Sequence, residues 1–195
     1  MKSSPRLAAL LGAAIATTVL IAGVPALAGS GHSAHRVVMV GGAAMLPARN
    51  IVENAVNSAD HTTLVAAVKA AGLVETLASP GPFTVFAPTN AAFAKLPAGT
   101  VDTLTRPEQK AALTKILTYH VVSGNVSSSQ LIRMIRAGRG KAELTTVSGG
   151  KLTARMNGRG VVLIDELGGR ARVTQADVVQ SNGVIHVTDT VSMPR

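Results

Sequence analysis

The sequence lacks cysteine and tryptophan, and its aromatic residues amount to 2% of 195 residues: Phe83, Phe86, Phe93 and Tyr119. Without cysteine the chain has no disulfides, thiolate nucleophiles, thiolate zinc sites or iron–sulfur clusters. So few aromatic rings argue against an aromatic sugar-binding cleft and against a base-stacking platform for single-stranded nucleic acid. These absences exclude several enzyme classes and make nucleic acid a poor partner.

Catalytic motifs are also missing from the chain. It contains no Gly-x-Ser-x-Gly elbow, no His-Glu-x-x-His pair and no phosphate-binding loop. Asp165-Glu166 is a carboxylate pair, but Gly168-Gly169 follows it, which indicates the solvated end of a hairpin rather than an acid–base site. We therefore predict a protein that is not an enzyme and that has no cofactor and no metal site.

Hydrophobic residues make up 47% of the chain and charged residues 15%, which is enough for a folded core, and the net charge is +9. The first 28 residues have the pattern of an export signal. Lys2 and Arg6 precede an uncharged apolar run, and a small-residue cleavage site follows at 26–28. An uncleaved membrane anchor is the alternative interpretation. We expect export to the periplasm, cell surface or extracellular space, and a mature form that is not transmembrane.

We expect three parts: a signal peptide over 1–28, a flexible spacer over 29–49 and one folded domain over 50–195. The spacer carries His32 and His35, which lack a carboxylate companion and are not expected to bind metal. Within the domain, helix signals come first and period-two strands come last, which predicts an α+β fold. Helices are expected to start near Asn50, Asp60, Leu73, Thr89, the Thr105–Glu108 capping box and Ser127. Strands are expected over 83–87, 144–147, 151–156, 161–164, 171–179 and 184–191.

Three segments, in this order, resemble the fasciclin domain family. They are residues 84–93 (TVFAPTNAAF), 119–122 (YHVV) and 182–189 (NGVIHVTD), and the resemblance extends over about residues 50–194. It implies a single domain with a twisted antiparallel β-wedge or sandwich flanked by short helices. It also implies a small secreted bacterial protein that serves as an adhesion or matrix-interaction module without catalysis.

The same resemblance marks a candidate binding surface. In animal members, the Tyr-His motif and an Asp followed by a branched apolar residue are associated with integrin binding, and these map to Tyr119, His120, Asp177 and Val178. The residues themselves also allow a structural interpretation. His120 lies on the apolar stripe of its helix and His186 on a terminal core strand, where buried, hydrogen-bonded histidines are expected.

The positive charge is concentrated late in the chain. Residues 51–130 hold five basic and five acidic side chains, whereas residues 131–195 hold ten basic and five acidic ones. We predict one continuous basic patch. It comprises Arg133, Arg136, Arg139, Lys141, Lys151, Arg155 and Arg159. Expected partners are cell-surface or matrix proteins, with anionic polysaccharide and lipid head groups as further candidates, and we expect a monomer. The alternatives are a solubilising surface, or a carrier or sensor for small apolar ligands or anionic glycans.

Overall fold

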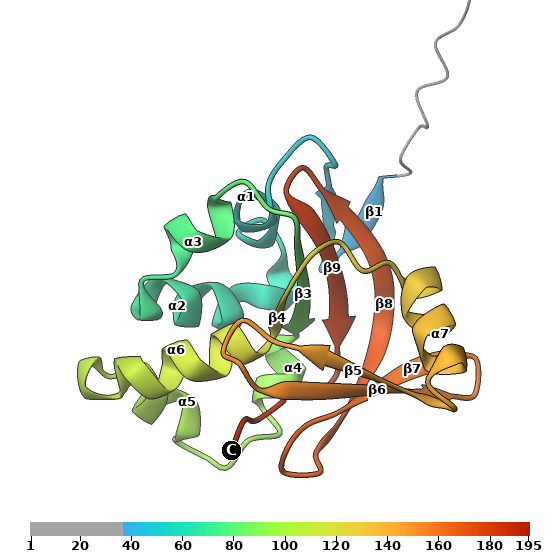
Figure 1. The fold of residues 1–195 in the computed structure, drawn as a ribbon. Helices are drawn as coiled ribbons and strands as arrows, with labels where there is room; N and C mark the ends of the chain where they lie inside the picture. The colour runs from blue at the N-terminus through green and yellow to red at the C-terminus, as the bar shows by residue number, and fades with distance from the viewer. Residues whose placement is uncertain (1–36) are drawn as a thin grey trace, which may run out of the picture. The chain divides into compact units, whose positions relative to one another are not determined.

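The computed structural model describes residues 37–195, in which short helices come mostly before the strands of one curved sheet (Figure 1). This is the expected α+β architecture. The helices are α1 Ile51–Ala55, α2 Thr62–Ala71, α3 Val74–Ala78, α4 Asn90–Phe93, α5 Thr100–Leu104, α6 Lys110–Tyr119 and α7 Ser128–Ala137. The 3-10 turns are Ala59–His61 and Pro107–Gln109. No helix among these residues is both long enough and apolar enough to cross a membrane.

The strands are β1 Val38–Val40, β2 Ala43–Met45, β3 Phe83–Pro88, β4 Val121–Ser123, β5 Lys141–Thr145, β6 Lys151–Asn157, β7 Gly160–Ile164, β8 Arg170–Gln180 and β9 Gly183–Thr188. Seven of them form one sheet in the order β4-β3-β9-β8-β7-β6-β5. All neighbours are antiparallel except β3 and β9, which run parallel, in contrast to the fully antiparallel sheet expected. A bridge between Val122 and Thr146 joins the two edge strands, so that the sheet curls back on itself.

Most helices begin or end at the capping residues that the local sequence predicts. Asn50 with Glu53, and Ser127 with Gln130, form the two capping boxes that start α1 and α7. Gly72 ends α2 in the left-handed conformation. The box predicted at Thr105–Glu108 is wrong. Thr105 ends the unpredicted helix α5, and its hydroxyl donates backwards to the carbonyls of that helix.

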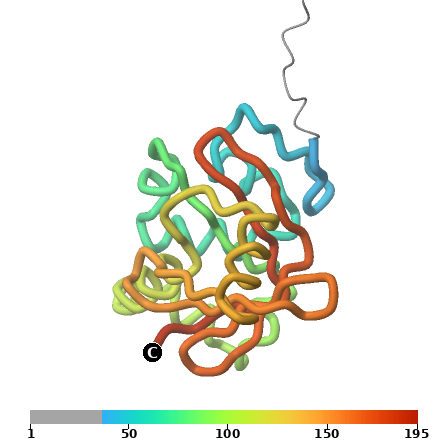
Figure 2. Tube along the Cα trace, turned by 45° about the vertical axis from the view of Figure 1, so that its right-hand side comes forward, coloured from blue at the N-terminus to red at the C-terminus, as the bar shows by residue number. Residues whose placement is uncertain are grey.

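The segment expected as a spacer is in part structured. Signal-peptide residues 1–28, and the spacer up to residue 36 with its two histidines, lie outside the described residues. Beyond them, β1 and β2 form a hairpin beside the β8–β9 hairpin (Figure 2), and Gln175 Nε2 donates to the Met39 carbonyl at 3.0 Å. Val40 and Met45 are 5% and 3% exposed. The short apolar stretch is therefore core-forming, because a second short strand pairs with it.

The sheet separates two hydrophobic clusters. Val85 and Ala87 of β3, with Ile185 of β9, face a cluster that α1 to α6 and the β1–β2 hairpin cover. Phe86 points to the other side, into a cluster between the curved sheet and α7. Alternation along β3 thus supplies both clusters from one strand.

A buried asparagine connects two helices to the sheet. Asn182, in the β8–β9 turn, accepts from the Ile51 N–H at 3.0 Å and donates to the carbonyls of Leu77 and Ser79 at 2.8 and 2.9 Å. The next residue, Gly183, allows a close backbone approach, because a Cβ there would clash with the Phe83 carbonyl. This turn therefore holds α1, α3 and β3 together.

Replacing the Asn182 side chain should destabilise the fold. We expect Asn182→Ala to lower the free energy of unfolding by about 1–3 kcal/mol, because it leaves a buried N–H and two carbonyls without their partner. Urea unfolding followed by circular dichroism measures the loss. Ser181→Ala, at the exposed neighbouring position, is the control. Equal stability of the two variants would contradict the assignment.

Candidate functional site

A row of basic side chains crosses the outer face of the sheet from β5 to β8. Lys141 pairs with Arg155, Arg155 with Val162, and Val162 with Arg172. Directly opposed residues on neighbouring strands point to the same side of a sheet, about 5 Å apart. Arg170 lies in the adjacent row on this side, and Lys151 lies one row further along β6, four residues from Arg155. All five basic residues are exposed. We call Lys141, Lys151, Arg155, Arg170 and Arg172 the sheet-face cluster.

Two carboxylates offset part of this charge. Glu143 lies 3.5 Å from Lys141 Nζ and 3.3 Å from Lys151 Nζ. The hydrogen bond and the charge of Lys151, and the charge of Lys141, lower the pKa of Glu143. Asp189 accepts from the Arg172 N–H at 2.8 Å and lies 3.8 Å from Lys95 Nζ. The guanidinium groups of Arg155, Arg170 and Arg172 form no ion pair within the described residues.

These three arginines line a surface hollow of about 600 Å³ whose walls include Val162, Ile164 and Asp189. Its walls combine positive charge with branched apolar side chains. Such a surface is able to hold an acidic polymer by charge and to pack against its uncharged parts. Arg170 and Arg172 were not singled out from the sequence, although Arg-Ala-Arg on a period-two strand places both on one face.

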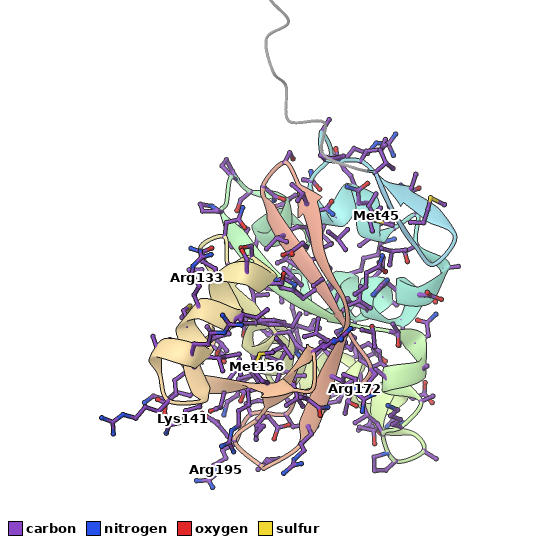
Figure 3. All side chains as sticks on the ribbon, turned by 90° about the vertical axis from the view of Figure 1, so that its right-hand side faces the viewer. Met45, Arg133, Lys141, Met156, Arg172 and Arg195 are labelled. Atoms are coloured by element: carbon purple, nitrogen blue, oxygen red, sulfur yellow. The ribbon has the colours of Figure 1, made fainter. Side chains whose placement is uncertain are left out.

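The remaining predicted basic residues lie elsewhere. Arg133 and Arg136 are exposed on α7, Arg139 follows that helix, and Arg159 lines a different hollow beside α7. Helix α7 packs on the inner side of β5 to β7, the side opposite Lys141 and Arg155. Figure 3 shows Arg133 on α7 and Arg172 on a strand of the sheet. The single patch expected from the sequence is therefore divided between two sides of the sheet.

The surface expected around the Tyr-His motif is buried. Tyr119, His120 and Val178 are 0%, 3% and 1% exposed. The Tyr119 hydroxyl donates to the Lys151 carbonyl at 2.6 Å and accepts from the Glu166 N–H at 3.2 Å, and burial raises its pKa to about 12. Periodicity along α6 and β8 places all three in the core, so that Asp177 is the one partly exposed member.

His120 joins helix α6 to the C-terminal segment. Its Nδ1 donates to the Ile116 carbonyl at 2.8 Å, and its Nε2 accepts from the Ser192 N–H at 3.0 Å. One nitrogen must donate and the other must accept, so the ring is neutral. Burial lowers the pKa of His120, in agreement with this assignment.

His186 and Asp177 hold the start of helix α7. His186 Nε2 donates to the Val126 carbonyl at 2.8 Å, and its Nδ1 accepts from the Asp177 N–H at 3.3 Å. Asp177 lies in a bulged part of β8 with a φ of 58°, and its carboxylate accepts from the Ser128 N–H at 2.7 Å and from the Ser128 hydroxyl. The bulge therefore directs Asp177 to the first turn of α7, where a negative charge is stabilising.

Neither of these imidazoles contacts a side-chain nucleophile, because both of their nitrogens bond to backbone groups. Within residues 37–195, no group of three or more His, Asp or Glu side chains is arranged to hold a metal ion. The arrangement around His120 and His186 is therefore suited to stability rather than to bond-breaking chemistry.

Comparisons with known proteins agree with the three sequence segments. A family model described as "Fasciclin domain" matches residues 59–194. Protein sll1483 of Synechocystis sp. is 45% identical over 195 residues, which covers 100% of this chain and 99% of that protein. Cell surface glycolipoprotein MPB83 of Mycobacterium bovis is 41% identical over 122 residues, which covers 63% of this chain and 48% of that protein. A solved domain pair from the insect cell adhesion molecule Fasciclin I shares the fold, with a TM-score of 0.65 at 18% identity, covering 73% of this chain and 50% of that one.

The two buried histidines should affect stability. We expect His120→Ala and His186→Ala each to lower the free energy of unfolding by about 1–3 kcal/mol, because each leaves a backbone N–H and a carbonyl unpaired. Chemical denaturation at pH 7.5 measures this. A variant with unchanged unfolding and lost partner binding would show a direct functional role instead.

Stability should also fall in mild acid. Burial lowers the pKa of His61, His120 and His186, so the unfolded chain binds protons more readily near its ordinary histidine pKa of about 6.5. Stability is then retained above pH 6.5 and lost as pH falls below it, by at most about 1 kcal/mol per histidine between pH 6.5 and 5.5. Urea midpoints measured across this range test the expectation, and a flat profile would contradict it.

Proposed function

The chain belongs to the fasciclin domain family, and on that premise we propose that it is a secreted or cell-surface interaction module that binds acidic partners without catalysis. The observation that supports the proposal most directly is the sheet-face cluster. It places five exposed cations from β5, β6 and β8 on the outer side of the sheet, at a hollow whose walls combine arginines with branched apolar side chains. Folded domains expose such concentrated charge at the cost of self-repulsion, and an acidic partner relieves it.

Membership of this family supports the proposed location, outside the cell or at its surface, and the proposed role in interaction. Fasciclin domains occur in an insect cell adhesion molecule, and a bacterial relative bears the name of a cell surface glycolipoprotein. An export signal over residues 1–28 is part of the proposal.

The partner's chemistry follows from the surface. Guanidinium groups bind carboxylates, sulfates and phosphates with paired hydrogen bonds, and Val162 and Ile164 offer apolar contact between the arginines. An acidic polysaccharide or an acidic segment of a matrix, envelope or cell-surface protein meets both requirements. Lipid head groups meet only the requirement for negatively charged groups. We propose that the protein acts in attachment through this face.

Charge reversal tests the face directly. We expect Arg155→Glu with Arg172→Glu to weaken binding to immobilised dextran sulfate and to cell envelopes about tenfold, since each exposed charge contact contributes up to about 1 kcal/mol. Binding of the unaltered protein should also weaken with salt. Surface plasmon resonance at 50 and 300 mM salt measures both effects.

The matched control is Arg106→Glu with Lys110→Glu, which changes the net charge equally at exposed positions on the helical side. If this control loses as much affinity, only net charge matters and the proposed face is wrong. A deletion strain whose attachment is unchanged on every surface tested would contradict the wider role.

A further inference from the structure

The helix-side hydrophobic cluster contains a cavity of about 60 Å³. Its walls are almost entirely apolar, with side chains from the β1–β2 hairpin, the first three helices and the central strands. They include Met45, Leu64, Leu77, Val85 and Ile185. Well-packed cores contain few voids larger than a water molecule. This one lies away from the sheet-face cluster, so its role is independent of the proposed function.

The cavity approaches the surface between helices. Val52 and Ala55 of α1, Val65 of α2 and Val74 of α3 line it, and all four are only half-buried. The cavity therefore has an apolar entrance formed by side chains of three short helices. A slender molecule can reach the interior there without displacing a strand.

One polar side chain in the wall lacks a partner. His61 is 3% exposed, and its Nδ1 lies 2.9 Å from the Ser58 hydroxyl. Its Nε2 is the one buried side-chain nitrogen or oxygen among the described residues that makes no hydrogen bond. Burial lowers the pKa of His61, against a smaller opposite effect of the Ala87 carbonyl, so the ring is neutral at pH 7. With the Ser58 hydroxyl donating to Nδ1, Nε2 carries the hydrogen.

Both features are unfavourable in the empty protein. An apolar void forfeits dispersion contacts, and a buried N–H that has only the nearby Ala87 carbonyl, and no well-aligned hydrogen bond, retains part of its desolvation penalty. Water satisfies neither, because nearly all of the wall is apolar. A single ligand with an apolar body and one acceptor oxygen would remove both penalties at once.

We propose that this cavity binds a slender aliphatic molecule with one hydroxyl or carbonyl oxygen, which accepts a hydrogen bond from His61 Nε2. The volume admits several water-sized groups, since one needs about 10–15 Å³, and is smaller than the apolar cavity of about 150 Å³ that binds benzene in another protein. A cavity of this size encloses only the first few atoms of an alkyl chain next to the oxygen, and the rest of a longer chain such as that of hexanol extends through the entrance. Such a site makes the domain a carrier or sensor of aliphatic compounds.

The test uses 1-hexanol and hexane as probes, with binding followed by methyl NMR shifts of the folded protein. We expect shifts at Leu64, Val85 and Ile185, which line the cavity. His61→Leu should weaken hexanol binding about fivefold, the value of one ordinary hydrogen bond, and should not weaken hexane binding. Ala55→Leu, which fills the entrance, should abolish binding of both probes. The control Ala66→Leu, at an exposed position on α2, should change neither.

Three results would overturn the proposal. Hexanol-induced shifts confined to methyl groups outside the cavity would place the binding on the surface. Unchanged binding of both probes by Ala55→Leu would exclude this entrance. Equal losses of hexanol and hexane affinity in His61→Leu would refute the hydrogen bond to the oxygen.

Discussion

The parallel pair β3–β9 is buried on both faces, and the rest of the fold depends on satisfying its polar groups. Five of the six residues of β3 and all six of β9 are buried. Because water cannot reach them, their polar side chains need partners inside the protein. Thr84 donates to the Gly124 carbonyl at 2.7 Å and accepts from the Val126 N–H at 2.8 Å, and His186 donates to the Val126 carbonyl at 2.8 Å. The loop before α7 is thereby fixed to the centre of the sheet.

This constraint explains why the most recognisable segments of the chain lie in the interior rather than on the proposed contact surface. Asn182, His186 and the Tyr-His motif are polar or amphipathic, which suggests exposure, but each pairs with backbone groups in the interior. Residues needed for such pairing cannot also be offered to a partner. The outward-facing side chains of β5 to β8 are not needed to pair with backbone groups in the interior. Binding chemistry can therefore be placed there without loss of the fold.

Much of the fold could be predicted from the sequence, because its signals are local. Capping at Asn50 and Ser127 and the period-two strands after residue 140 depend on neighbouring residues alone. The parallel pairing, the hairpin β1–β2 and the division of the basic patch depend on which side of a curved sheet each segment reaches. That is a property of tertiary packing. The site was predicted in part. Lys141 and Arg155 were expected together and pair across two strands, whereas Arg172 required knowledge of the strand order.

The two proposed sites meet at β8, where Val178 lines the cavity and Arg170 and Arg172 belong to the sheet-face cluster. Beyond β8 the cavity is lined by β9 and β3, and Phe86 of β3, one of its lining residues, stacks on His186 with ring centroids 5.5 Å apart. Coupling between a ligand in the cavity and a partner on the outer sheet would require two stable arrangements of β3 and β9. Their continuous ladder and fully paired polar side chains favour a single arrangement. The geometry thus favours independent binding, so that an aliphatic ligand would stabilise the domain without changing its affinity for an acidic surface.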